Sequence, residues 1–460
     1  MIESGSTCRE DGAGCAPSAR RVSLAILPSC EDLKDERKDC TPAAIWAPHG
    51  AKQMRVRPGM FLMHNRLRPE LEEILSRAIG RGSVTAQDAY TLINVSASEV
   101  PALMLAASLV RDRLSASTIT YSRKVFIPLT NLCRDTCGYC TFVKQPDEPD
   151  AMTMTPDQVI ASARAAKRAG CKEALFSLGD KPELKYASYR RWLKHLGYAT
   201  TLAYLRAMCD LVYRETGLLP HVNPGIMTSG DIASLREVSV SAGIMLESVS
   251  TRLLRAGEAH HRCPDKVPKQ RLATIEEAGR QKWAFTTGIL IGIGETLEER
   301  VDSLFAIKEL HERHGHIQEV IVQNFRAKPD IAMSEHPEPS LLDMLRTIAV
   351  ARLILGARMN LQAPPNLTPD AYQMYLFAGI NDWGGISPVT RDYINPERPW
   401  PKIIELRETT AAAGFELRER LAIYPEYVVQ RNGWIPEAFG EGLYAMADAE
   451  GLVKREAQVV

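Results

Sequence analysis

The chain has 460 residues, carries 56 Lys and Arg against 56 Asp and Glu, and is 45% hydrophobic. This composition is typical of a globular protein, and the zero net charge argues against binding to nucleic acid or anionic membranes, which attract clustered positive charge. The longest apolar stretch, residues 100–110, is shorter than the roughly 18 residues that a membrane-spanning helix needs. We therefore expect a cytoplasmic enzyme that acts on a small molecule.

The first part of the chain divides into an extension and a helical segment. Residues 1–65 mix Gly, Ser, Pro and charged residues without periodicity, which predicts a poorly ordered extension. The four cysteines in this extension have spacings that match no compact zinc site, so we interpret them as incidental. Over residues 66–118 apolar residues recur at helical spacing, which predicts a helical lead-in to the next domain.

From residue 119 onward, short apolar runs alternate with amphipathic helices. Capping boxes at Thr155 and Thr296 predict two of the helix starts. The predicted strands cover residues 124–129, 173–178, 218–222, 244–249, 286–293, 319–324 and 360–363. Successive strand–helix units predict a complete or partial (β/α)8 TIM-type barrel over residues 119–395, with residues 396–460 as a helical segment that packs on it. Active sites on this architecture lie in the loops after the strands.

The loop after the first predicted strand contains Cys133, Cys137 and Cys140 in a Cys-x3-Cys-x2-Cys pattern. Three thiolates can hold three irons of a [4Fe–4S] cluster, and the missing fourth ligand leaves one iron open to a small molecule. Two other interpretations are a zinc site completed by a distant histidine such as His260 or His261, and three unrelated thiols. The position after the first barrel strand favours the cluster.

Three other cysteines and two histidines have simpler interpretations. Cys171, Cys209 and Cys263 are scattered, and we expect them to be small buried hydrophobic residues. His260 and His261 stand among charged residues, so we expect them at a solvated helix end.

Polar residues at the other strand ends are further site candidates. The Gly-Asp-Lys-Pro-Glu segment at residues 179–183 follows the second strand, where it forms either a ligand-binding loop or an ordinary turn. Glu247 ends an apolar strand, so its carboxylate needs a partner, either a ligand or a neighbour such as Arg252. His221, Asn324 and Asp382 are candidates for holding a polar substrate and moving protons.

The cysteine loop carries a resemblance to a known family. The segment from Cys133 to Phe142 reads Cys-Arg-Asp-x-Cys-x-Tyr-Cys-Thr-Phe, which resembles the radical S-adenosylmethionine (SAM) enzymes. The finer resemblance is to the 7,8-didemethyl-8-hydroxy-5-deazariboflavin (FO) synthases of the CofG-subunit type. It extends over about residues 67–430 and includes the segments 177–183, 246–250, 288–295, 322–325 and 381–388.

The resemblance implies a radical SAM barrel that binds a [4Fe–4S] cluster through the three cysteines. It further implies SAM contacts from Tyr139, Gly179, Asp180, Lys181, Pro182, Glu183, Glu247, Ile291 and Gly292. The implied reaction converts 5-amino-5-(4-hydroxybenzyl)-6-(D-ribitylimino)-5,6-dihydrouracil into FO with loss of ammonia, which is a carbon–nitrogen lyase reaction in deazaflavin coenzyme biosynthesis. A companion radical SAM subunit would supply this substrate, and an electron donor would reduce the cluster.

Other functions remain open from the sequence. Within the superfamily, the rivals are the companion subunit and aminofutalosine synthase. Outside it, the rivals are a non-enzymatic iron–sulfur electron carrier, which is disfavoured because carriers normally use four protein ligands, and a zinc-stabilised scaffold protein.

Overall fold

The structure is a computed structural model that describes residues 67–82, 84–114 and 117–455. The extension predicted over residues 1–65 lies outside the described residues. Among the described helices, none combines the length and the apolar composition that crossing a membrane requires.

Eight parallel strands form a closed barrel, which confirms the predicted TIM-type fold. The barrel closes because β1 pairs with β2 along one part of its length and with β8 along another. The strands are β1 (Thr118–Thr130), β2 (Glu173–Leu178), β3 (Leu219–Asn223), β4 (Ser241–Gly243), β5 (Ala284–Ile291), β6 (Ile317–Asn324), β7 (Leu361–Gln362) and β8 (Asp382–Ile386). A ninth strand, β9 (Glu416–Glu419), pairs in parallel with the first residues of β1.

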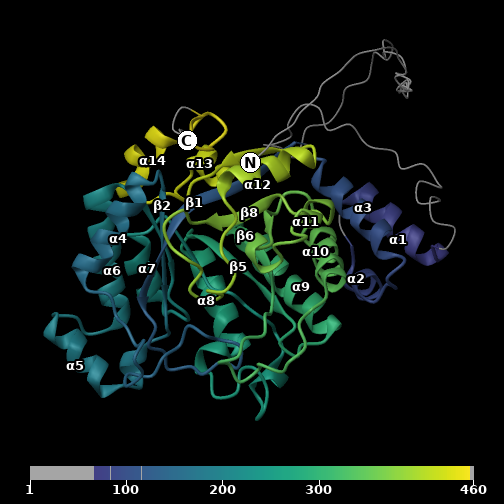
Figure 1. Cartoon of the computed structure of the whole chain (residues 1–460). Helices are drawn as coiled ribbons and strands as arrows, with labels where there is room; N and C mark the ends of the chain where they lie inside the picture. The colour runs from purple at the N-terminus through teal and green to yellow at the C-terminus, as the bar shows by residue number, and fades with distance from the viewer. Residues whose placement is uncertain (1–66, 83, 115–116, 456–460) are drawn as a thin grey trace, which may run out of the picture. The chain divides into compact units, whose positions relative to one another are not determined.

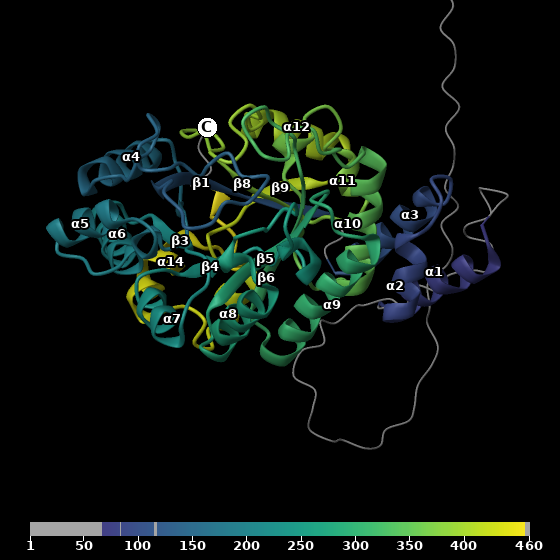
Figure 2. The same ribbon diagram turned by 90° about the horizontal axis from the view of Figure 1, so that it is seen from below.

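Helices surround the barrel in the views of Figure 1 and Figure 2. They are α4 (Pro156–Arg168), α5 (Ala187–His195), α6 (Thr201–Thr216), α7 (Ser229–Arg236), α8 (Pro268–Arg280), α9 (Leu297–His314), α10 (Leu341–Leu355) and α11 (Met374–Phe377). The predicted capping boxes are confirmed at the starts of α4 and α9, where Thr155 and Thr296 each accept a backbone hydrogen bond from the third helical residue.

The helical lead-in consists of α1 (Pro69–Arg81), α2 (Ala86–Ile93) and α3 (Val100–Arg111). In both views these helices lie at one side of the barrel, beside α9 and α10 (Figure 2). α2 packs against α9 and α3 packs against α10. The lead-in therefore covers the outer helices and leaves the barrel interior free for the site.

One predicted strand is wrong, and two strands of the structure were missed. The strand predicted at residues 244–249 is wrong, because β4 ends at Gly243 and Glu247 has a left-handed φ of 65° that breaks an extended chain. The strands β8 and β9 were not predicted. β8 contains Gly384 and Gly385, which have low strand propensity, and β9 reads Glu-Leu-Arg-Glu, where charged residues hide the alternating pattern.

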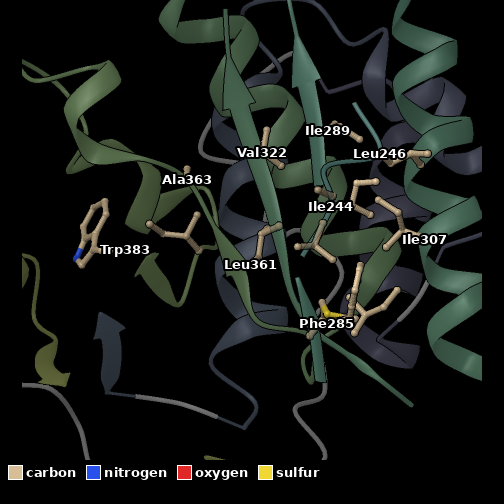
Figure 3. Close-up of a cluster of buried hydrophobic side chains, with 14 of the residues drawn as sticks. Ile244, Leu246, Phe285, Ile289, Ile307, Val322, Leu361, Ala363 and Trp383 are labelled. Carbon is tan, nitrogen blue, oxygen red and sulfur yellow. The ribbon is translucent and has the colours of Figure 1, made fainter. Parts of the chain in front are cut away.

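Apolar side chains between the strands and their helices form the main core. Figure 3 shows Ile244, Phe285 and Ile307 gathered between the barrel strands and α9. Ile289 on β5 and Val322 on β6 are paired in neighbouring strands, and both are buried. This packing fixes the strand ends, and with them the loops that carry the polar residues.

The last residue of β9 and the chain that follows it close the end of the barrel at which the strands begin. We call this segment, residues 419–424, the barrel floor. Leu421 and Ile423 of the floor form a second apolar cluster with Leu219 and Ala284, the residues at the starts of β3 and β5. The floor is also anchored by polar contacts, since the side chain of Gln318 accepts a hydrogen bond from the Tyr424 amide at 3.1 Å. The remaining helices, α12 (Ile403–Ala412), α13 (Pro425–Gln430) and α14 (Gly440–Met446), flank this segment in sequence.

Candidate active site

Two cavities lie inside the barrel. The first, which we call the cysteine cavity, has a volume of about 230 Å³ and is lined by Cys133, Cys137 and Cys140 together with Gly179, Asp180 and Glu247. The second, which we call the barrel cavity, has a volume of about 330 Å³ and reaches from the loops after the strands to Arg420 on the floor. Its volume falls in the range of about 300–1,000 Å³ that is usual for small-molecule sites.

The two cavities share a wall. Residues that line both are Phe142, Leu178, Asn223, Met245, Thr286, Ile321 and Ile394. Most of these side chains are apolar, so little polar surface separates the two spaces. A molecule in the cysteine cavity would therefore lie next to a molecule in the barrel cavity.

The cysteine loop is held by its own backbone and by the loop after β2. The sulfur of Cys133 accepts hydrogen bonds from the backbone amides of Asp135 and Asp180, at 3.3 and 3.1 Å. Arg134 and Asp180 form an ion pair across the same junction. Gly179 is required here, because a Cβ atom at this position would clash with the backbone of Leu132 and lie 2.7 Å from Cys133 Cβ.

The three thiols differ in their surroundings. Burial raises the pKa of Cys133, and it raises that of Cys140 to about 11. A hydrogen bond from the thiol of Cys263 lowers the pKa of Cys137. Cys263 is buried as expected, but it lies against the cysteine trio, and sequence spacing gave no sign of this contact.

The three cysteines suit a cluster better than a single ion. In the described part of the chain, no group of three or more His, Cys, Asp and Glu side chains is placed to hold one metal ion. Each thiolate of a [4Fe–4S] cluster binds its own iron, so the sulfurs need not converge on one point. The donor set of three thiols around a buried space, with backbone amides directed at one sulfur, fits such a cluster.

A compact set of charged residues borders the cysteine cavity. Lys266 pairs with Glu247 at 2.8 Å, and Arg271 pairs with Asp265. Burial opposes ionisation of both carboxyls, but these cations hold the pKa of Glu247 below its usual value and lower that of Asp265 to about 2. Arg252, which the sequence offered beside a ligand as an alternative partner for Glu247, is instead bound to Glu299 at 2.8 Å.

The inner end of the barrel cavity is polar. Lys124 on β1 pairs with Glu173 on β2 at 2.7 Å. The ring nitrogens of His221 on β3 lie 2.8 Å from Ser241 Oγ and 3.1 Å from Asn223 Oδ1. Burial lowers the pKa of His221 to about 4, so the imidazole is neutral near pH 7.

The floor contributes Arg420 to this end of the cavity. Its guanidinium donates to both carboxylate oxygens of Asp382, at 2.7 and 3.1 Å, and to Glu319 at 3.4 Å. The ring of Tyr424 lies 3.9 Å from the guanidinium carbon. Asp382, a predicted substrate residue, is fully buried and paired with Arg420. It would therefore affect a ligand indirectly, by positioning the Arg420 guanidinium.

The remaining predicted residues lie around the cavities rather than in their walls. Glu183 turns away to accept hydrogen bonds from Thr201 at the start of α6. Ile291 belongs to the main core. Gly292 borders a separate surface hollow near Glu295. Asn324 is buried, and its amide oxygen has no hydrogen-bond partner among the described residues.

Three further predicted SAM contacts also lie outside the walls of the two cavities. They are Lys181, Pro182 and Tyr139. Lys181 adopts a left-handed φ of 36° and donates to the backbone of Ile226, and Pro182 begins a short 3-10 turn. The hydroxyl of Tyr139 lies 3.1 Å from His260 Nε2. The expectation of a solvated His260 is wrong: the side chain is buried in this contact.

Several residues at the site were missed from the sequence. Lys124, Glu173 and Arg420 are charged residues at the ends of apolar segments, and this placement inside a predicted barrel was an available signal. Gln362 gave a similar signal, because it is a polar residue within the strand predicted at residues 360–363. Lys266 and Arg271 gave no such signal, because nothing in their local sequence distinguishes them from surface residues.

Comparison with known proteins places these features in a family. The radical SAM superfamily model matches residues 127–307. A 7,8-didemethyl-8-hydroxy-5-deazariboflavin synthase of Methanopyrus kandleri is 49% identical over 336 residues, which cover 73% of this chain and all of that protein. An FO synthase of Streptomyces coelicolor is 48% identical over 400 residues, 85% of this chain. The chain spans only 46% of the length of that relative, about half.

Solved structures agree on the fold. A crystal structure of methylornithine synthase aligns with a TM-score of 0.59 at 20% sequence identity, covering 75% of this chain and 97% of the other. At this identity the likeness concerns the fold alone.

Proposed function

Since the chain belongs to the radical SAM superfamily and, within it, to the family of the 7,8-didemethyl-8-hydroxy-5-deazariboflavin (FO) synthases, we propose that it forms FO from 5-amino-5-(4-hydroxybenzyl)-6-(D-ribitylimino)-5,6-dihydrouracil. The reaction would release ammonia, which makes the enzyme a carbon–nitrogen lyase. The adjoining cysteine and barrel cavities carry this proposal, because a radical reaction needs its radical source and its substrate side by side.

Cys133, Cys137 and Cys140 would hold three irons of a [4Fe–4S] cluster, and SAM would occupy the rest of the cysteine cavity. When bound and reduced, the cluster supplies the electron that cleaves SAM into methionine and a 5′-deoxyadenosyl radical. Asp180 and Glu247, which line the cavity, would bind the polar groups of SAM. The SAM contacts inferred by resemblance for Tyr139, Gly179, Lys181, Pro182, Glu183, Ile291 and Gly292 stay predictions.

The substrate would occupy the barrel cavity, with its reacting carbon against the shared wall. His221 is neutral near pH 7 and lines this cavity, so we propose that it positions the substrate and accepts a proton there. Asp382 would position Arg420 and would not contact the substrate itself. A direct role for Asn324 stays a prediction, supported by its unpartnered amide oxygen.

The chain would act with other proteins. We propose that a companion radical SAM enzyme makes the substrate and that an electron donor reduces the cluster. The cytoplasmic location expected from the sequence stays a prediction.

An anaerobic turnover assay tests the proposal. The reconstituted protein is mixed with SAM, a reductant and the hydroxybenzyl-dihydrouracil substrate, and deazaflavin fluorescence and 5′-deoxyadenosine are measured together. We expect both products, and neither in Cys137→Ala. Cys209→Ala makes the same chemical change in a buried cysteine on α6 and should retain activity. Formation of 5′-deoxyadenosine without the fluorophore would show that the substrate is wrong.

A further inference from the structure

The charged groups at the inner end of the barrel cavity are paired with one another. Lys124 is paired with Glu173, and Arg420 is paired with Asp382 and Glu319. His221 is neutral near pH 7. Hydrogen-bond donors and acceptors are therefore plentiful at this end of the cavity, while both cations that face it among the described residues are already paired with carboxylates. A phosphate or carboxylate would need a cation that is not already paired.

Gln362 adds a polar group that lacks a partner. Its side chain is 5% exposed, its amide oxygen has no hydrogen-bond partner among the described residues, and its nitrogen makes one long hydrogen bond of 3.4 Å to Trp383. A buried acceptor left in this condition is destabilising. A ligand hydroxyl could satisfy it, because a hydroxyl both donates and accepts.

Two glycines make room for these long side chains. A Cβ atom on Gly384 would clash with Gln362, and one on Gly385 would clash with Lys124. Both glycines belong to β8, where they let Gln362 and Lys124 reach the cavity.

The outer part of the barrel cavity has a different character. The rings of Phe126 and Trp400 are stacked, with centroids 5.0 Å apart and planes 5° apart, and Phe142 and Ile321 continue this apolar surface to the shared wall. Flat rings pack well on such a surface. The cavity is thus apolar beside the cysteine cavity and polar at the floor.

We propose that the inner end of the barrel cavity is a polyol subsite, in which Lys124, Glu173 and Gln362 bind the ribityl chain of the substrate while the ring system lies outward against Phe126. The alternation of ammonium, carboxylate and amide groups matches a row of hydroxyls, each of which donates and accepts. The subsite rests on the proposed function, because that function supplies a substrate with such a chain.

Equilibrium binding tests the subsite without requiring turnover. The full-length, cluster-reconstituted chain is titrated with FO and with its analogue that carries a methyl group in place of the ribityl chain, and the ligand fluorescence is followed. We expect FO to bind at least tenfold more tightly than the analogue. Gln362→Met keeps the side-chain length but removes the amide, so it should weaken FO binding about threefold to tenfold and leave the dissociation constant of the analogue unchanged.

Three further variants separate the outcomes. Glu173→Gln, which keeps the shape of the side chain, should also weaken FO binding selectively, whereas Phe126→Leu should weaken both ligands. Gln281→Met makes the same change as Gln362→Met at the end of α8 and should affect neither ligand. Thermal unfolding of each variant shows whether it folds.

Equal affinity of the two ligands, or an equal loss for both in Gln362→Met, would overturn the polyol subsite and would indicate that the heterocycle occupies the inner end. Failure of FO to bind would overturn it as well. The proposed function is judged separately by the turnover assay, so it can survive the loss of the subsite.

Discussion

Arg420→Met should lower the free energy of unfolding by about 3–5 kcal/mol, the usual cost of removing one partner from a buried ion pair. The Arg420 side chain is 2% exposed, and its carboxylate partners Asp382 and Glu319 are 0% and 8% exposed. Methionine preserves most of the packing beside Tyr424, so the loss would arise from two carboxylates left without their cation. Burial already raises the pKa of Glu319, and the substitution should raise it further.

Urea unfolding followed by tryptophan fluorescence measures this change. The matched control is Arg455→Met, because Arg455 forms a 2.9 Å ion pair with Glu416 in which the side chains are 68% and 47% exposed, and exposed pairs contribute about 0–1 kcal/mol. Adding Asp382→Asn to Arg420→Met should restore part of the stability, since it removes one uncompensated charge. A loss no greater than that of the control would refute the description of the floor as a buried ionic anchor.

Three further predictions concern the site and its scaffold. His221→Gln should flatten the pH dependence of unfolding: the folded pKa of about 4 lies below the unfolded value of about 6.5, so the stability from neutral His221 is complete above pH 6.5 and up to about 3 kcal/mol is lost as the pH falls toward 4. Parallel pH profiles for the two proteins would contradict this. Gly179→Ala should displace Cys133 and reduce the iron bound per protein after reconstitution, whereas Gly230→Ala, whose added Cβ atom would meet only ordinary contacts, should bind iron normally. Thr296→Ala should cost about 1 kcal/mol of unfolding free energy through loss of the α9 cap, and Thr296→Ser should retain most of that stability.

The sequence predicted the barrel because its strongest signals are local. The strand at residues 173–178 agrees with β2, and the caps at Thr155 and Thr296 lie where expected. These signals depend on a few neighbouring residues. The glycine-rich β8 and the charged β9 were missed because their pairing with β1 comes from tertiary structure and overrides their weak strand propensity.

The site was predictable only where a motif fixed the spacing. The cysteine trio lies on a single loop, so its place at a cavity followed from the position of the first strand. The sequence did not indicate Lys266 as a partner of Glu247, because Lys266 reaches it from a short 3-10 turn 19 positions further along the chain. The polar end of the barrel cavity assembles residues from β1, β2, β7 and the chain after β9, and no local pattern connects such distant segments.

The barrel floor has a consequence for the order of folding during synthesis. Tyr121 on β1 and Glu419 at the end of β9 are in contact although they are 298 positions apart in the sequence. Chains emerge from the ribosome N-terminal end first, at about 5–20 residues per second, so the cysteine loop and the first eight strands would be available well before residues 419–424 close the barrel. A nascent chain would pass through a state with an open floor, in which apolar residues such as Leu219 and Ala284 are exposed. Because this closure is a long-range contact that forms late, the open-floor state would expose apolar surface to aggregation and to chaperones.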